Sequence, residues 1–88
     1  MKRSNEFIKR KIGTQYVIVA VGAATKRFNG MISVNGTGSF IWDQLENEVT
    51  LADIVKAITD TYEVDAATAE AHAVKFLDTL REVGALAE

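Results

Sequence analysis

The alternation of hydrophobic and polar residues predicts strands in the first half of the chain. Phe7–Ile12 alternates roughly, and Gln15–Val21 is nearly continuous in β-branched and aromatic side chains, as a central strand would be. After a predicted loop at Gly22–Lys26, Arg27–Val34 returns as a third strand, with Gly30 inside it as a bulge or a place of close backbone approach. Three strands with short connections predict an antiparallel meander.

A helix is expected directly after the third strand, over Gly36–Leu45. Asn35 precedes it, and its side chain can accept a hydrogen bond from a backbone N–H near Thr37 or Gly38, which lacks an intrahelical partner. The following residues share one face of this helix at helical spacing: Gly38, Ile41, Trp42 and Leu45.

Two more helices are predicted in the second half. Thr50 and Asp53 form a variant capping box at the start of Leu51–Tyr62. The apolar stripe of that helix comprises Leu51, Ile54, Val55, Ile58 and Tyr62.

The last predicted helix is Ala66–Val83, with Asp65 as its N-cap and Gly84 as a left-handed terminator. Its apolar stripe comprises Ala69, Ala73, Phe76, Leu77, Leu80 and Val83. The element order is therefore β-β-β-α-α-α, an α+β fold in one domain over residues 1–88.

Composition restricts the class of protein further. Hydrophobic residues at 48% and charged residues at 25% are typical of a globular chain. The absence of cysteine excludes a disulfide framework and a thiolate metal site. The basic start has no apolar run behind it, and no apolar run approaches the length of a spanning helix. We therefore expect a soluble, cytoplasmic domain with no membrane partner.

Charge is unevenly distributed along the chain. Residues 1–41 hold seven basic residues and one acidic residue, whereas residues 42–88 hold three basic and eleven acidic residues. A basic half could steer an acidic ligand to one side of the molecule. Solvated sheet and helix faces that differ in sign by chance are the alternative.

The search for catalytic chemistry finds little. His72 is the only histidine, and no metalloprotease, redox, nucleophile-elbow or Walker motif occurs. The segment from Gly36 to Gly38 could hold an anion on free N–H groups, but it equally permits tight packing. We predict no catalytic residue, no metal site and no cofactor.

Three segments in combination resemble the PqqD family, the pyrroloquinoline quinone biosynthesis protein D group. They are FNGMISVNGTGSFIWDQL, TLADIVKAITDTYEVD and FLDTLREVGAL, and the resemblance covers about Phe7 to Leu86. The segment VGAATKRFNG is longer than in the quinone-cofactor members. The chain is therefore more similar to the broad set of PqqD-like proteins.

This resemblance implies a function that composition cannot show. Members of the family are RiPP recognition elements with a winged-helix-like fold, and they bind the leader of a ribosomally synthesised precursor peptide. They present the leader to a modifying enzyme, often a radical SAM enzyme, and they are not enzymes themselves. The leader adds as an extra strand to the third strand, in a groove formed with the last helix, which is a known mode of peptide recognition.

The predicted peptide-binding residues lie on the third strand and on one flank of the last helix. If Ile32 and Val34 point into the core, Met31 and Ser33 point to the other face. The opposite flank of the helix, with Glu70, Val74 and Arg81, is more charged and lacks an aromatic ring. The predicted set comprises Gly30, Met31, Ile32, Ser33, Val34, His72, Phe76, Thr79 and Val83. Alternatively, Phe76 and Val83 only fill the core.

Two rival functions come from other classes. A winged-helix nucleic-acid binder would need basic residues on its recognition helix, but Ala66–Val83 has a net charge of −1. Nucleic acid is therefore not the expected partner. A dimerisation module that pairs two open strand edges is also compatible with the sequence, so the protein is expected as a monomer or an edge-paired homodimer.

Overall fold

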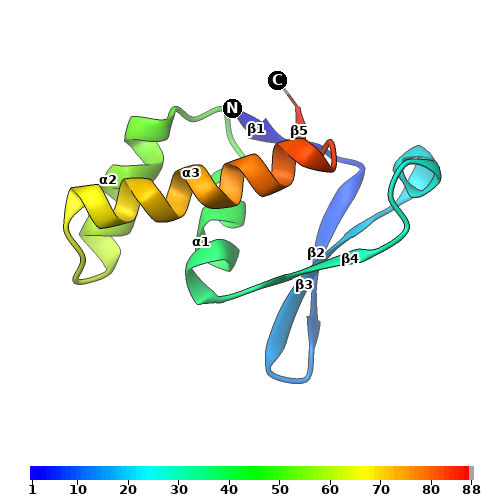
Figure 1. The fold of residues 1–88 in the computed structure, drawn as a ribbon, viewed down its shortest axis with the longest axis horizontal. Helices are drawn as coiled ribbons and strands as arrows, with labels where there is room; N and C mark the ends of the chain where they lie inside the picture. The colour runs from blue at the N-terminus through cyan, green and yellow to red at the C-terminus, as the bar shows by residue number, and fades with distance from the viewer. Residues whose placement is uncertain (88) are drawn as a thin grey trace.

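The computed structural model describes residues 1–87 and has an α+β fold, in which a three-stranded antiparallel sheet precedes three helices (Figure 1). The predicted fold class is thus confirmed. The strands are β1 (Lys2–Arg3), β2 (Phe7–Ile12), β3 (Gln15–Ala20), β4 (Met31–Val34) and β5 (Leu86–Ala87). The helices are the 3₁₀-helix η1 (Gly22–Lys26) and the α-helices α1 (Gly36–Gln44), α2 (Leu51–Thr61) and α3 (Ala66–Glu82).

The main sheet has the strand order β2-β3-β4, with antiparallel pairing throughout. A two-residue turn joins β2 to β3, and its first residue, Gly13, has φ 63°. Glycine at that position is typical of a type II′ hairpin turn, whose twist matches that of the flanking strands. β3 is therefore the central strand, as predicted from its apolar sequence.

The segment between β3 and β4 differs from the prediction. Gly22–Lys26 is a 3₁₀-helix rather than a loop, and the N–H groups of Arg27 and Phe28 both donate to the carbonyl of Ala24. Because those N–H groups complete the helical turn, they cannot join a strand ladder. The third strand is consequently Met31–Val34 alone, and the prediction that it begins at Arg27 is wrong. Gly30 lies before the strand, so it is not a bulge within it.

All three predicted N-caps are present. The Asn35 side chain accepts a hydrogen bond of 2.7 Å from the N–H of Gly38, and Asp65 accepts one of 2.7 Å from Thr68. Thr50 and Asp53 form the reciprocal capping box. Gly84 follows α3 with φ 76°, the left-handed conformation expected of a terminator. Local sequence therefore fixes where each helix begins.

Two of these caps make stability depend on pH. Hydrogen bonding to Thr50 lowers the pKa of Asp53, chiefly through the backbone N–H and to a smaller extent through the hydroxyl. The backbone N–H and the hydroxyl of Thr68 lower the pKa of Asp65 in the same order of importance. A carboxylate whose pKa is lower in the folded state than in the unfolded state stabilises the fold. This stabilisation is complete above the unfolded-state pKa and is lost as the pH falls through the folded-state pKa. Asparagine also caps helices but does not titrate in this range. On acidification from about pH 6 to about pH 3, we expect the Tm of wild type to fall further than that of the Asp53→Asn/Asp65→Asn variant. Equal decreases in Tm would contradict this assignment.

The hydrophobic core lies between the sheet and the three helices, with Trp42 at 2% exposure among its largest members. Further fully buried side chains come from β3 and from every α-helix: Ile18, Ile41, Leu45, Ile54, Ile58, Leu77 and Leu80. Tyr62 departs from the predicted stripe, because it follows the end of α2, is 39% exposed and packs edge-on against Phe40.

A short sheet joins the two ends of the described chain, which the sequence analysis did not predict. β1 pairs antiparallel with β5, so that Arg3 lies opposite Leu86. The Arg3 guanidinium also lies over the Trp42 ring, 5.4 Å from its centroid, and donates to the Trp42 carbonyl. Figure 1 shows β1 and β5 on the far side of α3 from β4. Neither terminal strand therefore pairs with β4.

Lys9 ties the sheet to α1. Its ammonium lies 2.7 Å from the Ser39 hydroxyl and 2.7 Å from the Asp43 carboxylate, and it also lies over the ring of Tyr16. The Lys9 side chain is only 18% exposed, so its ion pair is less screened than an ordinary surface pair. These contacts hold α1 against the sheet.

Candidate functional site

The outer edge of β4 is open within the part of the chain that the structure describes. β4 has β3 as its only neighbour in the sheet, and the terminal sheet β1–β5 lies elsewhere. Ile32 and Val34 pack against the core, whereas Met31 and Ser33 are exposed. The predicted alternation of side chains along this strand is confirmed.

The hydrogen-bond pattern of the sheet identifies the backbone groups that this edge presents. The N–H of Val21 donates to the carbonyl of Glu6, so odd-numbered residues around β3 bond toward β2. Even-numbered residues of β3 must then bond toward β4, because bonding directions alternate along a strand. These are Tyr16 and Ile18, which lie opposite Val34 and Ile32.

Ile32 and Val34 thus direct their N–H and C=O groups toward β3. The backbone groups of Met31 and Ser33 point the other way, toward the open edge. This edge therefore presents two donors and two acceptors to any strand that approaches it. Proline is absent from the whole sequence, so nothing in β4 removes a donor.

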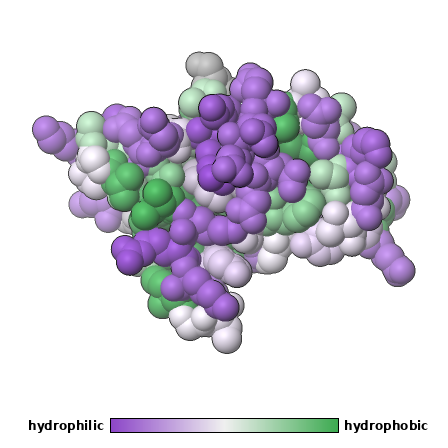
Figure 2. Space-filling model, turned by 180° about the vertical axis from the view of Figure 1, so that it is seen from behind, coloured by the Kyte–Doolittle hydropathy of each residue, from purple (hydrophilic) through white to green (hydrophobic). Residues whose placement is uncertain are grey.

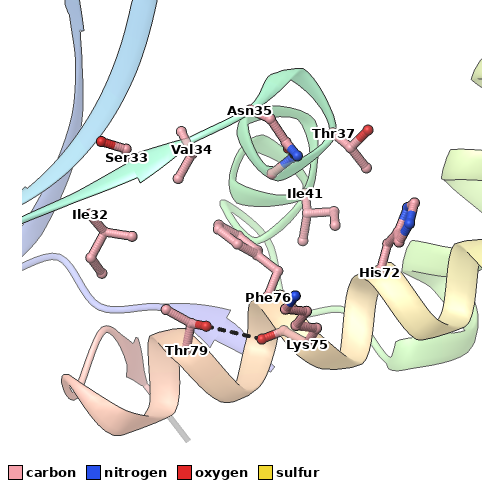
Figure 3. Close-up of a pocket in the computed structure, with 11 residues that line it drawn as sticks. Ile32, Ser33, Val34, Asn35, Thr37, Ile41, His72, Lys75, Phe76 and Thr79 are labelled. Atoms are coloured by element: carbon pink, nitrogen blue, oxygen red, sulfur yellow. Dashed lines mark hydrogen bonds between the residues drawn. The ribbon is translucent and has the colours of Figure 1, made fainter.

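A groove of about 340 Å³ lies along this edge, between β4, the start of α1 and one face of α3. Figure 3 shows Ile32 and Val34 on one side, Thr79 and Phe76 on the other, and His72 farther along α3. The residues that line the groove are Ile32, Ser33, Val34, Asn35, Thr37, Gly38, Ile41, His72, Lys75, Phe76 and Thr79. The groove is thus built from three elements that are distant in the sequence.

Phe76 forms the floor of the groove, and Gly38 allows it to do so. A Cβ atom at Gly38 would lie 3.3 Å from Cε1 of Phe76 and 3.3 Å from Oδ1 of Asn35. The absence of a side chain at Gly38 therefore lets the aromatic ring pack directly against the first turn of α1. The glycine is required for close packing rather than for an unusual backbone conformation, since its φ is not positive.

Two glycine substitutions in the first turn of α1 test this packing. A Cβ at Gly36 would meet nothing within 4 Å, so Gly36→Ala should stabilise the protein slightly by restricting the unfolded chain. Gly38→Ala restricts the unfolded chain to the same extent, but its Cβ must displace the Phe76 ring, and such overpacking typically costs about 1–3 kcal/mol. We expect Gly38→Ala to be about 1–2 kcal/mol less stable than Gly36→Ala in urea unfolding. Equal stability of the two variants would show that the ring is not held there.

The structure brings together six of the nine sequence-predicted site residues, namely Ile32, Ser33, Val34, His72, Phe76 and Thr79. Val83 does not line the groove, because it caps the end of α3 and packs against the core. Met31 lies on the edge strand but is 59% exposed on the outer face, and Gly30 precedes the strand.

The residues of α1 and Lys75 contribute to the groove although they were not predicted to do so. Asn35, Thr37, Gly38 and Ile41 line the groove beside β4, whereas the sequence suggested a helix cap, an anion site or core packing for these positions. The apolar segment around Ile41, which directly follows the edge strand, was the available signal. Lys75 was missed because the favoured flank of the helix was chosen for its low charge.

The opposite flank of α3 faces away from the groove. Glu70, Val74 and Arg81 are exposed and do not line it, and the Arg81 guanidinium lies 3.3 Å from the Asp78 carboxylate. The flank that the sequence favoured but did not prove, the one with Phe76, is therefore the one that lines the groove.

The outer face of the sheet carries exposed hydrophobic side chains. Figure 2 shows hydrophobic surface on the side of the molecule that the sheet occupies. Ile12 is 56% exposed there, and Ile8 and Met31 are exposed on the same face. This surface lies on the side of the sheet opposite to the groove.

Few ionisable side chains line the groove. Within residues 1–87, no group of histidine and carboxylate side chains is arranged to hold a metal ion. The ionisable residues that line the groove are Lys75 and His72. Over the same residues, no helix has both the length and the apolar character needed to cross a membrane.

Comparisons with known proteins agree on the fold. The family model described as Coenzyme PQQ synthesis protein D (PqqD) matches residues 15–86. No curated protein matches the chain.

Two solved structures are similar over nearly the whole chain. "TbiB1 in Complex with the TbiA(beta) Leader Peptide" is 28% identical, with a TM-score of 0.77, and the match covers 98% of this chain and 94% of that one. "Lasso peptide synthetase B1 complexed with the leader peptide" is 21% identical, with a TM-score of 0.74, over 96% and 93% of the two chains. The second likeness concerns the fold alone.

Proposed function

The chain belongs to the PqqD family, and on this premise we propose that it is a non-catalytic domain that binds the leader of a ribosomally synthesised precursor peptide. The leader adds as a strand to the open edge of β4 and lies in the groove beside α3. The observation that carries the proposal is this unpaired edge, which faces an aromatic floor across the groove. The similar protein TbiB1, which was solved with a leader peptide, supports it.

The backbone of β4 contributes affinity that does not depend on the amino-acid sequence of the leader. Met31 and Ser33 offer two N–H and two C=O groups, and each hydrogen bond to a guest strand contributes about 0.5–1.5 kcal/mol. Four such bonds give at most about 6 kcal/mol, from which the ordering of a flexible peptide must be subtracted. Main-chain pairing alone is therefore too weak for tight binding, so side chains of the leader must contribute.

The groove supplies that side-chain contribution. Every second side chain of an added strand points to the same face, here toward Ile32, Val34 and Phe76. Apolar side chains of the leader at these positions are removed from water against Phe76 and Ile41. The intervening side chains point toward the outer face of the sheet. Specificity thus comes from alternate residues of the leader.

A second partner completes the proposed role. A domain without catalytic residues that holds a leader is useful only if an enzyme acts on the remainder of the precursor. We infer that the chain presents the bound precursor to a modifying enzyme in the cytoplasm, and a radical SAM enzyme is the candidate that the family suggests. Co-purification of a tagged chain with such an enzyme, dependent on the precursor, tests this part separately.

Titration of ¹⁵N-labelled protein with the leader of a precursor encoded beside its gene tests leader binding. We expect amide shifts concentrated at residues 31–35 and on the face of α3 that includes His72 and Phe76. Saturable binding that leaves the β4 amides unchanged would reject strand addition. A scrambled leader of the same composition is the control.

Sedimentation distinguishes leader binding from the alternative use of the same edge. If two chains pair through β4, the dimer occupies the backbone groups of Met31 and Ser33 that the leader needs. Added leader should then dissociate any dimer. A dimer that persists with saturating leader bound would show that it uses another surface.

A further inference from the structure

Lys75 is a cation without a partner among the described residues, and it lies beside the aromatic ring of the groove. It lies on α3 and lines the groove next to Phe76. Within residues 1–87 its ammonium has no hydrogen bond, ion pair or aromatic contact. His72 is the only other ionisable residue that lines the groove, and no carboxylate lines it among the residues that the structure describes. The groove therefore offers positive charge without an internal counter-charge.

Lys75 differs from the other basic residues of the second half of the chain, which form ion pairs. Residues 42–88 contain eleven acidic residues and only three basic ones. Of these three, Lys56 lies 2.7 Å from the Asp60 carboxylate, and Arg81 lies 3.3 Å from that of Asp78. Among the residues that the structure describes, Lys75 has no such partner, although it belongs to the same strongly acidic half. Its charge is available to a ligand in the groove.

The spacing of side chains along an added strand determines which of them can reach Lys75. Residues on the same face of a strand are about 6.6 Å apart, and successive turns of a helix are about 5.4 Å apart. A guest side chain that packs on Phe76 therefore has its next same-face neighbour about one helical turn away. Toward the N-terminus of α3, that position carries His72 (Figure 3). Lys75 directly precedes Phe76, about 1.5 Å along the helix axis, but helical side chains lean toward the N-terminus, and the long Lys75 side chain can reach the level of His72.

We propose that the groove selects a strand with an acidic side chain two residues from a large apolar one, and that Lys75 selects the acid. The apolar side chain packs on Phe76, and the carboxylate pairs with the ammonium of Lys75, whose side chain extends from the residue before Phe76 toward the N-terminus of α3. This inference rests on the proposed leader binding and specifies the side chains that the groove selects in the leader. A guest with a basic side chain at the acidic position is rejected by like-charge repulsion.

Selection from a displayed library of random ten-residue peptides tests the inference on the full chain. On wild type, we expect enrichment of Asp or Glu two residues from Leu, Ile, Phe or another large apolar residue. On Lys75→Glu, the preference should change to Lys or Arg at the same position. On Lys75→Gln, the acidic preference should weaken without inverting. Lys56→Glu on α2, which makes the same change of net charge outside the groove, should select as wild type does.

Binding of one selected acidic peptide and its lysine-substituted counterpart makes the test quantitative. We expect wild type to prefer the acidic peptide by about 5- to 10-fold, and Lys75→Glu to reverse this preference. Peptides that shift the Met31 and Ser33 amides but show no acidic preference would overturn this inference alone. Failure to select any peptide that shifts those amides would count against leader binding itself.

Discussion

Ser33→Pro is expected to weaken leader binding by about 10- to 100-fold while the protein stays folded. Ser33 directs its N–H toward the open edge, so proline there removes a donor to the leader and no bond to β3. A leader carbonyl is left unsatisfied, and the proline ring occupies the space in which the carbonyl would lie. Proline is tolerated on an edge strand where the N–H faces outward, so the Tm should change little. Isothermal titration and thermal unfolding measure the two effects.

Ser33→Ala is the matched control for this substitution. It removes the exposed hydroxyl but retains the backbone N–H, so its affinity for the leader should stay within about twofold of wild type. Met31→Pro, at the first residue of β4, should repeat the effect of Ser33→Pro. Wild-type affinity in a folded Ser33→Pro variant would contradict the assignment of the open edge.

Trp42→Ala is expected to remove a large part of the stability of the fold. Trp42 is 2% exposed in the core, and such truncations typically cost 3–5 kcal/mol. A chain of 88 residues has a total free energy of unfolding of about 4–13 kcal/mol. The substitution also removes the ring over which the Arg3 guanidinium lies, and so weakens the contact between the N-terminus and α1. Urea unfolding followed by circular dichroism measures the loss.

Trp42→Phe provides the comparison for this prediction. It retains an aromatic ring in the core and should lose clearly less stability than Trp42→Ala. Arg3→Ala leaves the core intact, removes the guanidinium over the ring and its hydrogen bond to the Trp42 carbonyl, and should have the smallest effect of the three. If Trp42→Ala unfolded at nearly the same urea concentration as wild type, Trp42 would not be central to the core.

Sequence patterns were sufficient for the α-helices, because each of them has a local start signal. Asn35, Thr50 and Asp65 cap the helices that they were predicted to cap. The apolar residues of α1 and the buried face of α3 followed from helical spacing alone. Tyr62 was misplaced because its side chain lies past the last turn of α2, where helical spacing no longer applies.

The elements that were wrong or missing have weak local signals. η1 lies in a segment without proline, and it forms because Ala24 is buried and its carbonyl accepts two N–H groups. The strands β1 and β5 are two residues long, too short for any periodic pattern, and they exist only because the chain ends meet. Such contacts depend on tertiary structure.

The groove could be predicted only in part. Spacing on α3 placed His72, Phe76 and Thr79 on one flank, and the structure places that flank opposite β4. The prediction extended this flank to Val83, but α3 ends one residue earlier and Val83 turns toward the core. The close approach of Gly38 to Phe76 joins two helices, so no single segment of sequence reveals it.

The most direct test of strand addition is the measurement of scalar couplings through hydrogen bonds between labelled protein and ¹³C-labelled leader. The proposed arrangement predicts couplings from the Met31 and Ser33 amides to leader carbonyls, and none from Ile32 or Val34, whose N–H groups bond to β3. Couplings from Ile32 or Val34, or a saturated complex without any coupling along β4, would contradict it.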